Sequence, residues 1–340
     1  MAKNEEKKLG VALAGLGTYS CDELGPALTQ TKHCYLAGII TDEASKANEW
    51  KEKYQLDEKN IYTYDNMDNI ADNKDIDIVY IVLPVYLHKE FTCRAAKAGK
   101  HVICEKPMAM NVQQCMEMIK MCNDQNVKLS IGYHLHFEPF NLEMMRLGQK
   151  EIYGKVLNIE AQNGFVYKDD EDTWRLDKEK AGGGSLMHMG IYTIQAARYV
   201  TGEEPIFVTA RGEKTRPQLF KEVDETAYFK LEFPGGATAE CVSSYNKDMN
   251  FLKVKAEKGW FELTSAYRYK NMKGETIEGP MNFDPNVNQQ ALQMDDFALC
   301  IKENKTSRVS GEEGLRDMKV IEAVYKSIVS GKKQAIDGTL

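Results

Sequence analysis

Short apolar runs alternate with segments of helical spacing along the first 131 residues. The apolar runs, which read as strands, are Leu9–Ala14, Tyr35–Thr41, Ile76–Leu83, His101–Cys104 and Val127–Ile131. The segments with helical spacing are Ser45–Tyr54, His88–Ala98 and Asn111–Asn126, with one more running up to Leu28. Strands that alternate with helices predict βαβ units and a mostly parallel sheet. Continuous apolar runs are typical of strands that are buried on both faces.

The pattern changes after about residue 132 to longer segments of alternating polarity. These segments are Lys155–Val166, Ile206–Arg211, Glu225–Phe233, Ala237–Ser244, Phe251–Glu257 and Trp260–Leu263. Turn residues Pro234-Gly235-Gly236 and Lys258-Gly259 separate two pairs of them and predict hairpins. Helices are expected at Pro139–Lys150, Gly184–Thr201, Gln289–Glu303 and Glu312–Ser330. The second half is therefore predicted to be an α/β domain on a large, mostly antiparallel open sheet.

We expect an α/β protein with two domains, a Rossmann domain over residues 1–131 and a second domain over residues 132–340. A chain of 340 residues is longer than a single core usually supports. A large open sheet must cover one of its faces, and a second subunit could do so. We therefore expect a homodimer or homotetramer, with oligomerisation assigned to the second domain.

Composition narrows the classes of partner. The net charge of -7 and the pI near 5.6 argue against nucleic-acid binding. No run of about 18 apolar residues occurs, which argues against a membrane span. The charged N-terminus lacks the apolar segment of a secretory signal. Eight scattered cysteines without a C-x-x-C pair are expected to be buried thiols. We expect a soluble, cytoplasmic protein that binds neither nucleic acid nor membrane.

The first strand is followed by Gly15-Leu16-Gly17-Thr18-Tyr19-Ser20, which opens a predicted helix. A dinucleotide-binding loop needs two glycines for the turn and the close approach of phosphate, then a small residue for packing. Ser20 stands where the third glycine usually stands. The anion would meet N–H groups at the positive end of the helix. The alternative is a tight glycine turn without a ligand.

Two residues near the end of the second strand bear on the choice of coenzyme. Asp42, after Thr41, can accept hydrogen bonds from the adenosine ribose and repel a 2′-phosphate, which favours NAD. Lys46 could instead hold a 2′-phosphate. Alternatively, Asp42 is a helix N-terminal charge and Lys46 is a solvated surface residue. We favour NAD over NADP on the strength of Asp42.

Glu105-Lys106-Pro107 follows the strand that ends at Cys104. Ligands of open α/β sheets bind beyond the carboxyl ends of the strands, so Lys106 is expected in the cleft. An oxidised nicotinamide and partial desolvation would both lower the pKa of its ammonium group. A lysine in this state can exchange a proton with a substrate hydroxyl. The alternative is an exposed lysine in a loop.

The order and spacing of these motifs resemble the Gfo/Idh/MocA oxidoreductase family, and within it the glucose–fructose oxidoreductase-like branch. The resemblance covers nearly the whole chain. The matching stretches are Gly15–Ser20, Leu83-Pro84 with His88, Glu105-Lys106-Pro107, Gly132-Tyr133, Phe137-Glu138-Pro139, Trp174–Asp177, Gly182–Tyr192 and Gln289–Phe297.

The resemblance implies a Rossmann domain followed by a substrate-binding domain. It implies that Lys106 lies beside the nicotinamide and that Tyr192 is a second group that handles protons. It also implies a set of cofactor-binding residues outside the phosphate loop. These are Thr41 and Lys46 near a 2′-phosphate, Trp174 and Arg175 near the nicotinamide end, and Leu83, Pro84, His88 and Glu105.

Two residues depart from the family pattern. His188 stands four residues before Tyr192, where the family usually has aspartate. The two residues share a helix face, and a neutral imidazole can relay a proton but supplies no fixed negative charge. His134 stands where this branch often has arginine, and His136 shares its face if the segment is extended. We predict that His134, His136, His188 and Tyr192 contact substrate. With Glu138 these histidines also have spacing compatible with a metal, but we expect none.

The sequence thus predicts an NAD(P)-dependent sugar dehydrogenase or reductase. Hydride would pass between the nicotinamide and a hydroxyl or carbonyl of a sugar or cyclitol, while Tyr192 or Lys106 handles the proton and His188 assists. One alternative is an NAD-dependent glycosidase that oxidises the sugar transiently. Another is a catalytically inactive NAD(P)-binding protein, which the missing aspartate makes plausible.

Overall fold

The computed structural model describes residues 7–168 and 174–338, and the chain divides into two compact units. The first unit comprises Met1–Ala109, Gln113–His134 and Asn288–Gly314. The second comprises Met110–Val112, Leu135–Val287 and Leu315–Leu340. Each unit is built on a sheet of its own, as the two patterns of polarity predict.

The first unit contains a parallel sheet of six strands in the order β3-β2-β1-β4-β5-β6. The strands are β1 (Leu9–Ala14), β2 (Cys34–Ile40), β3 (Ile61–Tyr62), β4 (Ile78–Ile81), β5 (His101–Cys104) and β6 (Leu129–Ile131). The helices are η1 (Ser20–Leu24, a π-helical turn), α1 (Gly25–Leu28), α2 (Ala44–Tyr54), α3 (Val85–Lys97), α4 (Val112–Asp124) and α8 (Gln289–Lys302), with 3₁₀ turns η2 (Glu58–Asn60) and η3 (Met67–Asp72). The predicted Rossmann sheet is confirmed.

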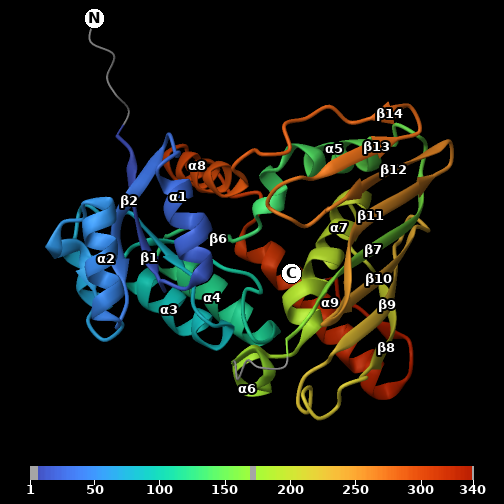
Figure 1. The fold of residues 1–340 in the computed structure, drawn as a ribbon, viewed down its shortest axis with the longest axis horizontal. Coiled ribbons are helices and arrows are strands. Elements are labelled where there is room, and N and C mark those ends of the chain that lie inside the picture. The colour runs from blue at the N-terminus through green and yellow to red at the C-terminus, as the bar shows by residue number, and fades with distance from the viewer. Residues whose placement is uncertain (1–6, 169–173, 339–340) are drawn as a thin grey trace, which may run out of the picture. The chain divides into compact units, whose positions relative to one another are not determined.

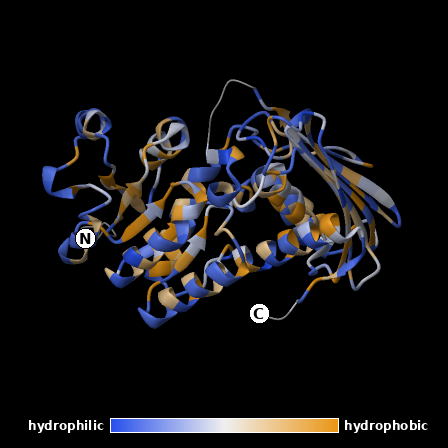
Figure 2. Ribbon diagram, turned by 90° about the horizontal axis from the view of Figure 1, so that it is seen from below, coloured by the Kyte–Doolittle hydropathy of each residue, from blue (hydrophilic) through white to orange (hydrophobic). Residues whose placement is uncertain are grey.

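Both faces of this sheet are buried, as its continuous apolar strands require. The core on one face contains Val11 and Leu13 of β1 together with Trp50 of α2. On the other face α3 packs against β4 and β5. Figure 2 shows hydrophobic strands enclosed by helices whose outer turns are hydrophilic. The sheet is therefore a rigid platform, and its carboxyl-terminal edge carries the loops described below.

Helix α8 belongs to this first unit although it lies late in the chain. Sequence analysis places it in the second domain. In the structure it lies beside α1 (Figure 1), and its Met294 and Phe297 join the core that covers β1. The apolar face of α8 is buried against residues that are more than 250 positions away in the sequence, a pairing that the pattern of the helix alone does not indicate.

The second unit contains a sheet of nine strands in the order β14-β13-β12-β11-β7-β10-β9-β8-β15. The strands are β7 (Val156–Val166), β8 (Phe207–Glu213), β9 (Thr226–Glu232), β10 (Thr238–Ser244), β11 (Asn246–Ala256), β12 (Gly259–Thr264), β13 (Lys273–Thr276), β14 (Gly279–Pro280) and β15 (Gln334–Ala335). Neighbouring strands are antiparallel except for β7 and β10. The predicted hairpins β9–β10 and β11–β12 and the mostly antiparallel sheet are confirmed.

Helices cover one face of the nine-stranded sheet (Figure 1). The helices of this unit are α5 (Pro139–Gln149), α6 (Lys178–Ala181), η6 (Leu186–Gly190, a π-helical turn), α7 (Ile191–Thr201) and α9 (Gly311–Ser330), with 3₁₀ turns η4 (His134–Phe137) and η5 (Trp174–Leu176). Helix α7 packs on β7 and β10. In the described residues the other face carries polar side chains such as Glu160, Arg211 and Lys230 around a shallow hollow. The predicted homo-oligomer stays a prediction.

A search of the described helices finds none that combines the length and the apolar character needed to cross a membrane.

Candidate active site

The glycine loop after β1 has the geometry of a phosphate cradle. Gly15 has a φ of 98°, and a Cβ on it would lie 2.5 Å from the carbonyl oxygen of Val82, so only glycine fits there. A Cβ on Gly17 would meet nothing within 4 Å, which leaves open space beside the start of the helix. The hydroxyl of the fully buried Ser20 donates a hydrogen bond to the Gly15 carbonyl at 2.6 Å. Serine at the third position thus closes the turn, and the residues fit a dinucleotide.

Gly17→Ala is expected to weaken binding of a dinucleotide at least about tenfold without lowering stability, because the added methyl would fill the space left for phosphate. Isothermal titration calorimetry with NAD and NADP measures the binding, and thermal unfolding measures the stability. Gly212→Ala on β8 is a matched control, since a Cβ there meets Ile328 at an ordinary 3.4 Å. Equal affinities of the Gly17 variant and the unchanged protein would contradict a phosphate site at this loop.

The residues that follow β2 already have partners within the protein. Asp42 accepts a hydrogen bond from the Tyr64 backbone N–H at 2.8 Å, and Lys46 pairs with Glu43 at 2.7 Å on the surface. The hydroxyl of Thr41 accepts from the Glu43 N–H at 3.2 Å. The assignment of Asp42 to a ribose and of Lys46 to a 2′-phosphate therefore stays a prediction, and these contacts favour neither NAD nor NADP.

His88 on α3 contacts two loops at the edge of the sheet, the one after β4 and the one after β5. Its Nε2 lies 2.7 Å from the Leu83 carbonyl oxygen and its Nδ1 lies 3.0 Å from that of Pro107. The ring is 1% exposed, and burial lowers its pKa, so the neutral form dominates and donates to one carbonyl at a time. Sequence analysis assigns His88 to cofactor binding. These contacts hold the Leu83-Pro84 and Lys106-Pro107 segments in place, and the assignment of His88 to cofactor binding stays a prediction.

Glu105 and Lys106 follow β5 at the same edge as the glycine loop. The Tyr80 hydroxyl donates to Glu105 Oε1 at 2.8 Å, and the Lys106 backbone N–H donates to Oε2 at 3.2 Å. Glu105 itself keeps some exposure, whereas Tyr80 is fully buried. The backbone of Gly132 lies so close to the Glu105 carboxyl group that a Cβ at position 132 would clash with it. Burial raises the pKa of Glu105 to about 7, against the opposing effect of the Lys106 charge.

Glu105→Gln is expected to stabilise the protein in a pH-dependent way. Because the pKa of Glu105 rises from 4.5 to about 7 on folding, wild-type stability falls as pH increases through that interval. The variant lacks this loss, so its advantage should be negligible below pH 4.5 and reach about 1 to 3 kcal/mol above pH 7. Urea unfolding at pH about 5 and about 8 measures it. Glu49→Gln, at an exposed position, is the control. If Glu105→Gln changes the free energy of unfolding by the same amount at both pH values, the raised pKa of Glu105 is refuted.

His134 is held in one tautomer by helix α8. Its Nδ1 lies 2.6 Å from the amide oxygen of Gln289, so Nδ1 carries the hydrogen and Nε2 is an acceptor. Burial lowers the pKa of His134 to about 4, and the nearby Lys106 charge acts in the same direction. His134 is thus a neutral hydrogen-bonding group near Lys106. Gln289 was part of the family resemblance, but its contact with His134 was not predicted.

The expectation that His134 and His136 share a face is wrong. Residues His134–Phe137 form a 3₁₀ turn, in which each residue rotates the chain by about 120°. Side chains that are two positions apart therefore point to different sides of the turn. His136 packs edge-on against Tyr199. Glu138 caps α5 by accepting from the Asn141 N–H at 2.8 Å. Among residues 7–168 and 174–338, no three His, Cys, Asp or Glu side chains are grouped to hold a metal.

In the second unit, Asp224 organises the start of the helix that carries His188 and Tyr192. Its carboxylate accepts from the N–H groups of Gly184 at 2.7 Å and Leu186 at 2.8 Å, and from the Tyr325 hydroxyl at 2.6 Å. Such capping satisfies N–H groups that the first turn leaves open. Sequence analysis missed Asp224, since it lies about 40 residues from the helix that it caps.

His188 and Tyr192 have different neighbours in this unit. His188 Nδ1 lies 3.0 Å from the Tyr245 hydroxyl, and its ring packs edge-on against Phe165. Tyr192 lies beside Tyr267 and lines a cavity of about 20 Å³, room for about one water, together with His136. His188 lies within the π-helical turn Leu186–Gly190, and Tyr192 follows in the first turn of α7. Their shared role in proton transfer stays a prediction.

Trp174 and Arg175 form a second predicted pair in this unit. The Arg175 guanidinium lies 4.8 Å from the centre of the Trp174 ring, a cation–π distance. The residues just before them, 169–173, lie outside the described part of the chain.

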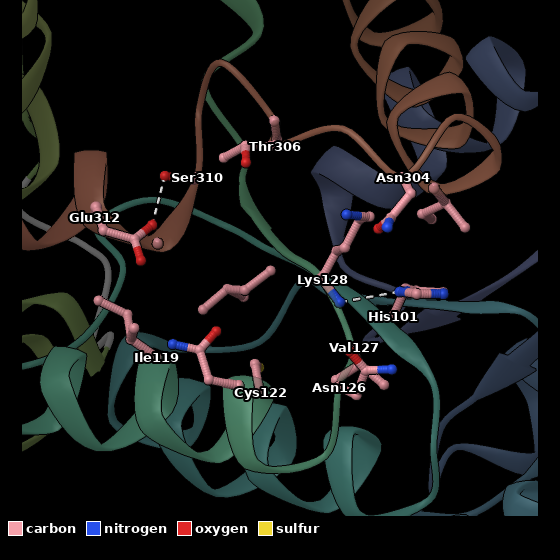
Figure 3. Close-up of a pocket in the computed structure, with 15 residues that line it drawn as sticks. His101, Ile119, Cys122, Asn126, Val127, Lys128, Asn304, Thr306, Ser310 and Glu312 are labelled. Atoms are coloured by element: carbon pink, nitrogen blue, oxygen red, sulfur yellow. Dashed lines mark hydrogen bonds between the residues drawn. The ribbon is translucent and has the colours of Figure 1, made fainter.

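The first unit also has a polar cavity away from these residues (Figure 3). Its volume is about 570 Å³, and it is lined by His101 and Lys128 at the amino ends of β5 and β6 and by Ser310 and Glu312 at the start of α9. The Lys128 N–H donates to His101 and Ser310 donates to Glu312, so these groups bond one another. The glycine loop and Lys106 lie at the opposite, carboxyl ends of the strands, where ligands of such sheets bind.

Two family models match the chain. The model described as "Oxidoreductase family, NAD-binding Rossmann fold" of GFO_IDH_MocA matches residues 9–133. The model described as "Oxidoreductase family, C-terminal alpha/beta domain" matches residues 147–336. Together they span both sheets and most of the predicted site residues, while His134 and His136 lie between the two matched ranges.

Individual relatives agree with these matches. The crystal structure of an aldose–aldose oxidoreductase from Caulobacter crescentus, complexed with glycerol, is 39% identical, with a TM-score of 0.94 over 97% of this chain and 100% of that chain. The D-xylose 1-dehydrogenase [NADP(+)] of Haloarcula marismortui is 26% identical over 93% of this chain and 90% of its own length. The 2,7-anhydro-N-acetylneuraminate hydratase of Escherichia coli is 31% identical, but over only 58% of this chain and 54% of its own length.

Proposed function

The chain belongs to the Gfo/Idh/MocA oxidoreductase family, and from this premise we propose that it transfers hydride between NAD(P) and a hydroxyl or carbonyl group of a sugar. The observation that carries the proposal is the shared edge of the parallel sheet. The Gly15–Ser20 cradle follows β1 and the Glu105-Lys106 pair follows β5, both at carboxyl ends of strands. A cradle for phosphate and a partly exposed acid and lysine at one edge suit redox chemistry on a bound dinucleotide.

The nicotinamide, when bound, supplies the hydride acceptor or donor. The protein supplies binding, orientation and proton transfer. The loop of Gly15 and Gly17, closed by Ser20, would hold the phosphates, and Lys106 would exchange a proton with the reacting oxygen of the sugar. His134, a neutral imidazole near Lys106, would contact the sugar. Tyr192, with His188 on the same helical segment, would be a further proton-handling group.

An aldose is the substrate class that we favour. The relative with the highest identity among those described above acts, by its name, on aldoses, and the alignment leaves almost none of either chain unmatched. The D-xylose dehydrogenase also acts on an aldose. An aldose–aldose reaction would oxidise one aldose and reduce another while the coenzyme stays bound.

The test is native mass spectrometry and nicotinamide absorbance on the purified protein, before and after addition of aldoses, ketoses and cyclitols. We expect a bound dinucleotide whose redox state changes with an aldose. If no dinucleotide is bound or taken up from millimolar NAD or NADP, the proposal fails. A dinucleotide that no sugar reduces or oxidises would instead favour a non-catalytic binding protein.

The match to an anhydro-sugar hydratase favours a second candidate, cleavage or hydration of a sugar through transient oxidation. In that reaction the coenzyme returns unchanged. Product formed from a glycoside or anhydro sugar without net reduction of NAD(P) would identify it.

A further inference from the structure

A chain of buried and partly buried hydrogen bonds runs from helix α8 to Glu105 and Lys106 within the first unit. Gln293 Nε2 donates to the Tyr80 hydroxyl at 3.1 Å, and Tyr80 donates to Glu105 Oε1 at 2.8 Å. The other carboxylate oxygen accepts from the Lys106 backbone N–H at 3.2 Å. Gln293 is 1% exposed and Tyr80 fully buried. Nothing in the sequence brings these residues together, since Tyr80 and Gln293 are 213 positions apart.

The structure places the amide nitrogen of Gln293, and not its oxygen, against the Tyr80 hydroxyl, which sets the direction of the bonds. An amide NH₂ group can only donate, so the Tyr80 oxygen accepts from Gln293. The single proton of the Tyr80 hydroxyl is then left for the Glu105 carboxyl group. A hydroxyl that donates stabilises the ionised carboxylate over the neutral acid. Gln293 therefore acts on Glu105 through Tyr80 by orienting that hydroxyl.

Lys106 is the charged group that interacts with this carboxylate. Its positive charge favours the ionised form of Glu105, and by reciprocity the carboxylate favours the ammonium form of Lys106. The other groups that face the carboxyl are the Tyr80 hydroxyl from β4 and the thiol of Cys104 on β5 itself. Burial raises the pKa of both Tyr80 and Cys104 well above their ordinary values, so both remain neutral. Burial favours the neutral form of Glu105, and the Lys106 charge and the hydrogen bonds from the Tyr80 hydroxyl and the Lys106 N–H favour the ionised form.

We propose that Gln293 and Tyr80 are positioning residues that keep Glu105 ionised as the counter-charge of Lys106 and so set the pH range in which Lys106 transfers protons. The proposal rests on the proposed function for its role in catalysis. The hydrogen-bonded relay itself concerns the free protein and can be tested without turnover. Helix α8, which is remote in the sequence, would then influence the pH range in which Lys106 transfers protons, in addition to packing in the core of the unit.

The test is competitive labelling of Lys106 with acetic anhydride as a function of pH, read by peptide mass spectrometry on protein free of coenzyme. Protonation of Glu105 removes a negative charge next to Lys106, so the amine loses its proton more readily and labels faster. We expect a break in the labelling curve near pH 7, where Glu105 titrates. Glu105→Gln should abolish this break.

Variants of the relay should move the break in a defined direction. Tyr80→Phe removes a hydrogen bond to a charged group, so the break should move up by about one to two pH units. Gln293→Met, which keeps the side-chain volume, should move it up by about half a unit. The controls are Tyr62→Phe, a buried tyrosine of the same unit, and Gln290→Met on α8, whose amide nitrogen has no hydrogen-bond partner in the structure. Both controls should leave the break in place.

The two proposals fail separately. A wild-type curve without a break, or a break that stays in place in folded Tyr80→Phe and Gln293→Met proteins, overturns the relay even if the protein oxidises sugars. A break that moves as expected supports the relay even if no sugar is turned over, and the proposed function alone then fails. In an active enzyme, the acid limb of the pH profile of kcat should move with the break, whereas loss of structure would lower kcat at every pH.

Discussion

Lys106→Met is expected to lower kcat for sugar turnover by about 10²- to 10⁴-fold, the usual contribution of one positioned proton-transfer group. The variant should still bind dinucleotide, because the cradle is formed by Gly15, Gly17 and Ser20 at a separate loop. Steady-state kinetics with the aldose that gives turnover measures kcat, and native mass spectrometry measures bound coenzyme. Loss of the coenzyme together with activity would assign Lys106 to binding instead.

The matched control is Lys89→Met on α3 of the same unit. Lys89 forms an ion pair with Glu117 at 3.0 Å on the surface, so its loss should leave kcat unchanged. If Lys106→Met retains kcat within about a factor of three of the unchanged enzyme, Lys106 is not the proton-transfer group. Tyr192→Phe would then be the next variant to measure.

Asp317→Ala is expected to lower the free energy of unfolding by about 3 to 5 kcal/mol, because it breaks a buried ion pair from one side. Asp317 on α9 lies 2.6 Å from the guanidinium of Arg198 on α7, and their side chains are 0% and 1% exposed. The carboxylate also accepts from the Gln195 amide at 2.9 Å. Its removal leaves part of a buried guanidinium and an amide without their acceptor. Denaturant unfolding followed by circular dichroism measures the change.

Two further variants separate loss of the charge pair from a general effect of substitution. Asp124→Ala breaks an exposed pair with Lys120 and should cost under about 1 kcal/mol. Arg198→Met combined with Asp317→Leu removes both buried charges and should recover part of the lost stability. Arg198 keeps Glu204 as a partner in Asp317→Ala, at 2.6 Å. If the double variant is as unstable as Asp317→Ala, the loss of a carboxylate from the buried guanidinium is not the cause.

Local patterns predicted most of the fold. The apolar run Leu9–Ala14 is the first strand to the residue, and the turns at Pro234–Gly236 and Lys258-Gly259 join antiparallel strands. These features depend on residues that are close in the sequence: alternation decides which face of a strand is buried, and glycine permits the turn. The glycine loop was predictable for the same reason, including the small residue at Ser20.

The sequence by itself therefore determined the two kinds of sheet, their longer strands and the loops that carry Gly15 and Lys106, whereas the short strands β3, β13, β14 and β15 were missed. The tertiary structure decided which unit α8 joins and what surrounds the reacting groups. Gln289 and Gln293 reach His134 and Tyr80, and Asp224 caps the helix of Tyr192, across 155, 213 and about 40 residues. Such contacts depend on how whole elements pack, because the hydrogen-bond partner of a buried polar group is chosen by proximity in space and not by spacing along the chain.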